Sequence, residues 1–173
     1  MSGRETPAEL RVVVVCMGNI CRSPMAEAVL RRELEAAGLG ERVVVDSAGT
    51  YGGHAGDRPD RRGQAAARRR GYDMTGQRAR GLAPEDAEAD LVLAMDRGNL
   101  RRVRQVIGEH PGAHLFMAAV GNAPAAEVPD PYYGDEDGFE HVLDLIEAGA
   151  AAWVERLRAQ LGVDKAPPGG SGT

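Results

Sequence analysis

The segment VCMGNICRSP at residues 15–24 holds the residues best suited to chemistry, a cysteine and an arginine six positions apart. It follows an apolar run that predicts a buried parallel strand, and it precedes an amphipathic stretch that predicts a helix. Such a strand–loop–helix turn directs backbone N–H groups and the positive helix end toward one point, which suits a phosphate-like dianion. Thiols near a helix N-terminus or an arginine ionise readily. We therefore expect Cys16 to be a nucleophile beneath an oxyanion site that includes Arg22.

Transfer of a phosphoryl group needs an in-line nucleophile, charge stabilisation on the equatorial oxygens and a proton for the leaving oxygen. Cys16 can supply the first, and the loop amides with the permanently charged Arg22 can supply the second. The candidate for the third is Asp130, in the segment VPDPYYG at residues 128–134. Two prolines restrict its backbone, and Tyr132 and Tyr133 stand beside it in a chain that is only 4% aromatic.

Strand-like and helix-like segments alternate along the chain. Four strands are expected, at residues 10–15, 43–45 and 91–95, with a weak one at 114–116. Helices are expected at residues 24–37, 60–70, 83–89, 99–107 and 139–161. This alternation predicts an α/β fold, a four-stranded parallel sheet with helices on both faces and the phosphate-binding loop after the first strand. We interpret Arg68–Arg70 as a solvated helix end and Trp153 as a core residue.

Ligands of such sheets bind beyond the carboxyl ends of the strands. Cys16, Ser47 and Asp96 follow the first three strands, so we expect them at one edge of the sheet. The chain of 173 residues is long enough for one domain with a sizeable core. We predict a flexible N-terminus at residues 1–9, the folded domain at 10–162 and a disordered tail at 163–173.

Composition and charge argue against several function classes. A net charge of -5 gives no basic surface for nucleic acid. Cys16 and Cys21 are the only cysteines and the four histidines are scattered, which argues against a disulfide framework or a metal site. No Gly-Lys-Ser/Thr follows Gly18, so a nucleotide P-loop is absent. Without a leader or an apolar span we expect a cytoplasmic protein with no membrane contact, although export without a signal peptide stays open.

Taken singly, several of these residues also have structural explanations. A cysteine after a strand is usually a small buried hydrophobe, and Cys21 could be inert filling of this kind. An aspartate between prolines usually forms a turn. Asp96 could simply cap the following helix, and tyrosines beside a turn more often pack than recognise a ligand. The combination with Cys16 and Arg22 favours the functional interpretation.

Several motifs occur in a familiar order along the chain. They are the Cys16 loop, DSAGT at 46–50, AR at 79–80, LAMD at 93–96 with Asn99-Leu100, and DPYYG at 130–134. With these motifs, residues 10–161 resemble the low-molecular-weight protein tyrosine phosphatases, in particular the bacterial type. The resemblance implies hydrolysis of phosphotyrosine in proteins without a metal or an organic cofactor.

The resemblance also implies roles for individual residues. Cys16 attacks phosphorus, Arg22 stabilises the transition state, and Asp130 protonates the leaving group and later activates water. Ser23 hydrogen-bonds to the Cys16 sulfur, and Asn19 holds the loop with Ser47 as its partner. Further residues are implied to bind substrate or to support the site; these are Met17, Gly18, Ile20, Cys21, Tyr51, His54, Tyr132, Asp96 and Tyr133.

The same resemblance implies regulation and partners. Some relatives protect the nucleophile by a reversible disulfide, and Cys21 occupies the position of the second cysteine. Such protection is useful because a thiolate oxidises readily. The implied partners are tyrosine-phosphorylated proteins and a cognate tyrosine kinase that phosphorylates Tyr132 or Tyr133. The implied protein is a monomer or a weak dimer.

Two departures from the family concern the substrate slot. Gly53 falls where many relatives carry a tryptophan wall, so we expect a wider slot shaped by Tyr51, His54, Ile20 and Tyr132. Gln77 falls where some relatives carry histidine, and the sequence offers no functional explanation for that change.

Three other functions share this fold. Thioredoxin-coupled arsenate reductases need two further cysteines near the third strand, and this chain lacks them. Protein-arginine phosphatases tend to carry threonine where Ile20 stands, and an apolar Ile20 favours a phenyl ring. A non-catalytic phosphotyrosine-binding module would need no proton donor at Asp130.

Overall fold

The sheet has four parallel strands, as the sequence predicts, and their order is β2-β1-β3-β4. The computed structural model describes residues 8–122, 126–132, 134 and 136–163. The strands are β1 (Leu10–Cys16), β2 (Val43–Gly49), β3 (Leu91–Ala94) and β4 (Ala113–Leu115). Cys16 pairs with Gly49, and Val15 pairs with Ala94. The central strands therefore end at one edge of the sheet, where a ligand site of this fold is expected.

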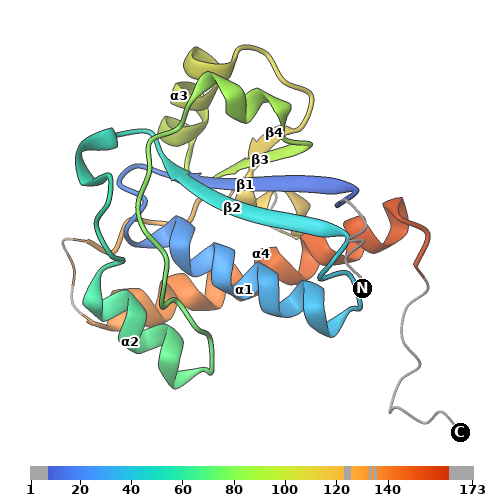
Figure 1. Cartoon of the computed structure of the whole chain (residues 1–173). Coiled ribbons are helices and arrows are strands. Elements are labelled where there is room, and N and C mark those ends of the chain that lie inside the picture. The colour runs from blue at the N-terminus through green and yellow to red at the C-terminus, as the bar shows by residue number, and fades with distance from the viewer. Residues whose placement is uncertain (1–7, 123–125, 133, 135, 164–173) are drawn as a thin grey trace, which may run out of the picture.

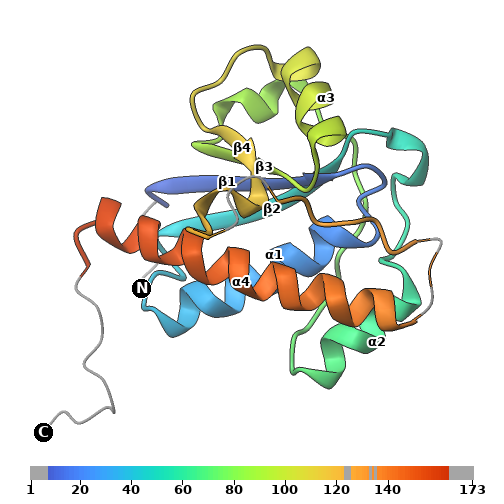
Figure 2. The same cartoon turned by 180° about the vertical axis from the view of Figure 1, so that it is seen from behind.

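Helices cover both faces of the sheet (Figures 1 and 2). One face carries α1 (Arg22–Ala36), α2 (Arg61–Arg69) and α4 (Glu136–Gln160), and the other carries α3 (Arg97–Ile107). Short 3-10 helices η1, η2 and η3 cover Gly52–His54, Pro84–Glu88 and Phe116–Ala119. The single-domain α/β architecture is thus the predicted one.

A separate hydrophobic core lies on each side of the sheet. The larger core lies under α1 and α4 and includes the fully buried Phe116, Phe139 and Ile146. The smaller core packs Val103 of α3 against Val13 and other strand residues. Trp153 is buried as predicted, and its indole N–H donates to the Phe116 carbonyl oxygen at 2.6 Å. Because β1 is buried from both sides, its continuous valine run is explained.

Some element boundaries differ from the predicted ones. The last helix begins at Glu136, three residues before the predicted start at Phe139. The prediction placed the start too late because residues 136–138 are not apolar and the apolar stripe starts only at Phe139. The fourth strand covers Ala113–Leu115, and Phe116 already belongs to η3. The predicted acidic helix at 83–89 is the 3-10 helix η2, in which the Asp86 carboxylate accepts from the Ala83 N–H.

Arg68 and Arg69 are exposed, as the interpretation of a solvated helix end expects, but Arg70 is partly buried and does not fit it. Arg70 pairs with Glu140, Asp144 and Glu147 along α4, and Arg69 also pairs with Glu140. The acidic side of α4 packs beside the end of α2, a long-range contact that local sequence does not indicate. These ion pairs attach α2 to α4.

The predicted flexible N-terminus and disordered tail fall largely outside the described residues and stay predictions. Within residues 8–122, 126–132, 134 and 136–163, no helix is both long enough and apolar enough to cross a membrane.

Candidate active site

The Cys16 loop joins β1 to α1 by a tight turn. Cys16 is the last residue of β1, and Arg22 is the first residue of α1. Asn19 has a φ of 58°, in the left-handed region that asparagine tolerates better than most residues. Its backbone N–H donates to the Cys16 sulfur at 3.3 Å. A side chain at Gly49 would place its Cβ 2.7 Å from the Met17 carbonyl oxygen, so only glycine lets β2 pack against this turn.

Hydrogen bonds between polar side chains hold the Cys16 loop in place. The Asn19 amide nitrogen donates to the Ser23 hydroxyl at 2.8 Å and to the Ser47 hydroxyl at 3.0 Å. Ser23 in turn lies 3.1 Å from the Cys16 sulfur. The contacts that the family resemblance implies for Asn19, Ser23 and Ser47 are therefore all present.

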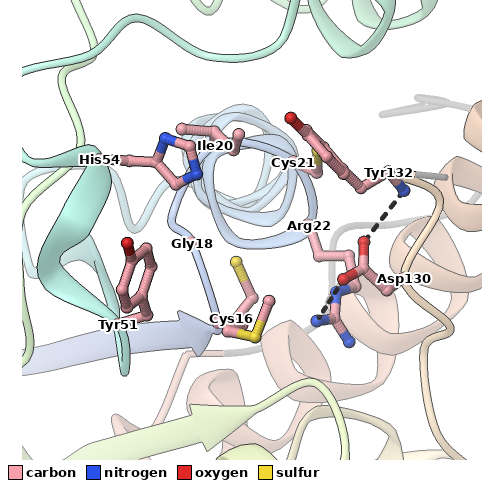
Figure 3. Close-up of a pocket in the computed structure, with 10 residues that line it drawn as sticks. Cys16, Gly18, Ile20, Cys21, Arg22, Tyr51, His54, Asp130 and Tyr132 are labelled. Carbon is pink, nitrogen blue, oxygen red and sulfur yellow. Dashed lines mark hydrogen bonds and ion pairs between the residues drawn. The ribbon is translucent and has the colours of Figure 1, made fainter.

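A cavity of about 180 Å³ opens above the Cys16 sulfur (Figure 3). The predicted catalytic and substrate-binding residues supply its lining, which consists of Cys16, Met17, Gly18, Ile20, Cys21, Arg22, Tyr51, His54, Asp130 and Tyr132. Asn19, Ser23, Ser47 and Asp96 do not line it but contact residues of the loop or Arg22. Tyr133 lies outside the described residues.

Arg22 is held by groups from two distant segments. Its Nη1 donates to the Asp96 carboxylate at 2.7 Å and to the Val128 carbonyl oxygen at 3.0 Å. Asp96 also caps α3 by accepting from the Asn99 N–H. The side chain of Arg22 is only 3% exposed, and among the described residues nothing accepts from its Nε. The guanidinium is thus fixed on one side and keeps a buried donor for an anionic ligand.

Asp130 reaches the cavity from the segment before α4. One oxygen lies 3.6 Å from Arg22 Nη2, and the other accepts from the Tyr132 N–H at 3.0 Å. The Val128 N–H donates to the Met95 carbonyl oxygen, which attaches this segment to the end of β3. The carboxyl group is one-third exposed, so it faces both the cavity and solvent.

Aromatic and apolar side chains form the cavity rim. Tyr51 packs edge-on against the His54 ring at 5.9 Å between centroids. A Cβ at Gly53 would lie 2.1 Å from the Tyr51 ring, so the Tyr51 ring occupies the space that a side chain at residue 53 would need. Tyr51, His54, Ile20 and Tyr132 surround the opening as the sequence predicts (Figure 3). Tyr51 therefore supplies an aromatic surface to the rim beside Gly53.

Cys21 is a second sulfur in the same cavity and is 4% exposed. Burial raises the pKa of its thiol strongly, and the nearby Asp60, Cys16 and Asp130 add to that effect. Burial therefore favours the protonated form of the Cys21 thiol.

Sequence reasoning gave no site role to three charged residues near the site, although Arg80 belongs to one of the family motifs. Arg62 donates to the carbonyl oxygens of Tyr132 and Gly134, which fastens the Asp130 segment to α2. Glu27 accepts from Ser47, and the Arg80 backbone N–H donates to the Asn19 side chain. Their partners are distant in sequence, so no local pattern marks these contacts.

The Gln77 amide donates to the Pro24 carbonyl oxygen in the first turn of α1. This departure from the family pattern therefore supports the helix that follows the loop.

The sequence profile of the family described as Low molecular weight phosphotyrosine protein phosphatase matches residues 11–163. A Synechocystis sp. protein named as belonging to the low molecular weight protein-tyrosine-phosphatases is 46% identical, over 88% of this chain and 99% of its own. The Streptomyces coelicolor low molecular weight protein-tyrosine-phosphatase is 41% identical, over 87% of this chain and 95% of its own.

Solved structures agree with the sequence comparisons. The crystal structure of YfkJ from Bacillus subtilis has a TM-score of 0.83 and 35% identity, and covers 91% of this chain and 99% of its own. A structure of the YwlE arginine phosphatase has a TM-score of 0.81 at 25% identity, and covers 90% of this chain and all of its own. A protein named as an arginine phosphatase, the alternative weighed from the sequence, thus occurs among the similar folds.

Proposed function

Because the chain belongs to the low-molecular-weight phosphotyrosine protein phosphatase family, we propose that it hydrolyses phosphotyrosine in proteins through a cysteinyl-phosphate on Cys16. The observation that carries this proposal is the convergence on one cavity of the Cys16 sulfur, the Arg22 guanidinium and the Asp130 carboxyl group. A nucleophile, a fixed cation and a proton donor are the three components that the reaction needs.

In the first step the Cys16 thiolate attacks phosphorus as the bond to the phenolic oxygen breaks. Arg22 and the amides of the loop bind the equatorial oxygens, where negative charge gathers. Asp130 gives its proton to the departing phenolate oxygen. The support for this role is its position in the wall of the cavity, beside Arg22.

In the second step water attacks the cysteinyl-phosphate, and Asp130 accepts a proton from that water. The S–P bond breaks, and the Cys16 thiolate leaves as inorganic phosphate forms. Ser23 donates a hydrogen bond to this thiolate from 3.1 Å and makes it a better leaving group. The cycle returns the enzyme to its starting state and consumes one water.

The rim favours an aromatic ester. Ile20, Tyr51 and Tyr132 offer apolar and aromatic surface to a phenyl ring, and Tyr51 and Tyr132 are substantially exposed. A phosphoarginine guanidinium would need hydrogen-bond acceptors, which Ile20 cannot supply. Phosphotyrosine is therefore our proposed substrate, and phosphoarginine is the alternative that the YwlE similarity makes worth testing.

We further propose that Cys16 and Cys21 form a protective disulfide. Peroxide first oxidises the Cys16 thiolate to a sulfenic acid; the Cys21 sulfur then displaces water and gives up its proton. The proximity of both sulfurs in one cavity supports this step. Thiolate chemistry also favours a reducing compartment, so we propose that the enzyme is cytoplasmic. We propose further that it acts on the products of a cognate tyrosine kinase and that it is a monomer or weak dimer.

The substrate class is tested by matched peptides that carry phosphotyrosine or phosphoarginine, with released phosphate as the readout. We expect a much higher kcat/KM for phosphotyrosine and no release by the Cys16→Ser variant. Preference for the phosphoarginine peptide would overturn the proposed substrate.

A further inference from the structure

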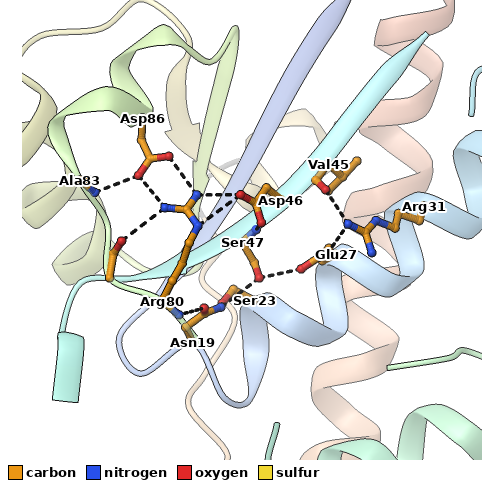
Figure 4. Close-up of polar contacts among 11 residues, drawn as sticks. Asn19, Ser23, Glu27, Arg31, Val45, Asp46, Ser47, Arg80, Ala83 and Asp86 are labelled. Atoms are coloured by element: carbon orange, nitrogen blue, oxygen red, sulfur yellow. Dashed lines mark hydrogen bonds and ion pairs between the residues drawn. The ribbon is translucent and has the colours of Figure 1, made fainter. Parts of the chain in front are cut away.

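A buried carboxylate lies close to the Cys16 loop and has no part in the proposed chemistry. Glu27, on α1, is only 5% exposed. One of its oxygens accepts from the Ser47 hydroxyl at 2.7 Å, and the other pairs with Arg31 at 2.6 Å (Figure 4). Burial raises its pKa, whereas the Ser47 hydrogen bond and Arg31 act in the opposite direction. The charges of Asp46 and Arg80 also act on Glu27, and they partly oppose each other.

A backbone donor identifies the orientation of the Asn19 side chain. The Arg80 backbone N–H donates to the Asn19 side chain at 2.9 Å, so the atom that faces it must be the amide oxygen. Arg80 is held in turn by ion pairs with Asp46 and Asp86. The Asn19 amide nitrogen must therefore face the two serines, as Figure 4 shows.

This orientation sets the direction of every remaining hydrogen bond. Both protons of the Asn19 amide go to the hydroxyl oxygens of Ser23 and Ser47. Each hydroxyl keeps one proton, which it must donate elsewhere. Ser23 donates to the Cys16 sulfur, and Ser47 donates to Glu27. The thiolate and the Glu27 carboxylate are thus the two acceptors at the ends of one hydrogen-bond chain.

We propose that Glu27 is a positioning residue. By accepting the Ser47 proton, it leaves the Ser47 oxygen free to accept from Asn19, and so helps to hold the Asn19 amide that keeps the Ser23 hydroxyl pointed as a donor at the Cys16 sulfur. The inference rests on the proposed function in that Cys16 is the nucleophile. Glu27 touches neither the cavity nor the reacting atoms, so its effect is exerted wholly through the chain of hydrogen bonds.

A Glu27→Gln variant tests this directly, because an amide cannot satisfy both neighbours. Ser47 and Arg31 each require an acceptor, and glutamine offers one oxygen and one NH₂ group. If the oxygen faces Arg31, the NH₂ faces Ser47 and the Ser47 proton loses its partner. A buried proton without an acceptor lowers the free energy of unfolding, so urea unfolding is measured first and alkylation is compared under conditions in which both proteins are fully folded.

The readout is alkylation of Cys16 by iodoacetate as a function of pH, which requires no turnover. We expect Glu27→Gln to slow alkylation at neutral pH about tenfold, with the pH profile moved to higher pH. Glu35→Gln removes the same charge from an exposed position of α1 and should match wild type. Phosphatase failure of the wild-type protein would contradict the proposed function without changing this comparison.

A double variant separates positioning from a general structural effect. In the Arg31→Met background the amide oxygen of Gln at position 27 is free to face Ser47. The added Glu27→Gln change should therefore slow Cys16 alkylation much less than it does when Arg31 is present. Equal slowing in both backgrounds would overturn the proposal. So would a Glu27→Gln alkylation profile that coincides with wild type.

Discussion

One oxygen of Asp130 lies 3.6 Å from Nη2 of Arg22, at the wall of the cavity above the Cys16 sulfur. The two residues come from the segment before α4 and from the first turn of α1. Their proximity places a proton donor beside the cation that would hold the phosphate. Nη1 of the same guanidinium donates to Asp96, so the protein fixes the position of the guanidinium beside the cavity.

Asp130→Ala should reveal the acid role through the leaving group. For phosphotyrosine or phenyl phosphate, whose leaving oxygen needs a proton, we expect kcat to fall about a hundredfold or more. For an activated ester such as para-nitrophenyl phosphate the loss should be much smaller. Steady-state kinetics across a series of aryl phosphates measures this difference.

Asp137→Ala is the matched control, because it removes an exposed carboxylate from the start of α4 outside the cavity. An equal loss across all leaving groups in Asp130→Ala would contradict the acid role and indicate a binding defect.

Asp96→Asn should disturb Arg22 without unfolding α3. The asparagine oxygen can still accept from the Asn99 N–H, but its NH₂ group would then face an Arg22 donor. We expect about a tenfold loss in kcat/KM and weaker inhibition by inorganic phosphate. Asp73→Asn, in an exposed turn, serves as the charge control. Wild-type phosphate affinity in Asp96→Asn would show that Arg22 is held adequately without this contact.

The parts of the site that sequence could predict are those encoded locally. The valine run, the loop and the following helix place Cys16 and Arg22 by short-range geometry alone. Asp130 could be selected only through its proline and tyrosine neighbours and the family motifs. Glu27 and Arg62 could not be selected, because each acts through partners from other segments. Arg80 stood in a family motif, but its contact with Asn19 could not be predicted. The early start of α4 was missed because its first turn has no apolar residue.

Asp86 should contribute stability that depends on pH. Burial opposes its charge, but its hydrogen bonds with Arg80 and the Ala83 N–H hold its pKa below the ordinary value. Such a carboxylate stabilises the fold above the pKa of the unfolded chain, and the contribution is lost as pH falls through the folded pKa. Arg80 is 36% exposed, so solvent screens part of the attraction.

We therefore expect Asp86→Asn to lower the free energy of unfolding by about 1–2 kcal/mol at neutral pH. The difference from wild type should narrow below about pH 4, near the ordinary Asp value. Urea unfolding at several pH values measures it. A difference that stays constant down to acidic pH would mean that the charge of Asp86 is not its source.

Peroxide should inactivate the enzyme reversibly. Because the Cys21 thiol is buried beside Cys16, we expect an internal disulfide that dithiothreitol reverses, with activity restored. Cys21→Ser should instead progress to sulfinic acid and recover little activity. Mass spectrometry of the peptide that holds both cysteines distinguishes these products. Sulfinic acid as the sole product in the wild-type protein would rule out protection by Cys21.

The central claim is a phosphoryl group carried on the Cys16 sulfur. Rapid acid quench during turnover of para-nitrophenyl phosphate, followed by peptide mass spectrometry, measures it directly. We predict one phosphoryl group on Cys16 in the wild-type protein. In Cys16→Ser we predict neither a phosphorylated peptide nor activity. Turnover that persists in Cys16→Ser, or a phosphoryl group found on another residue, would contradict the account.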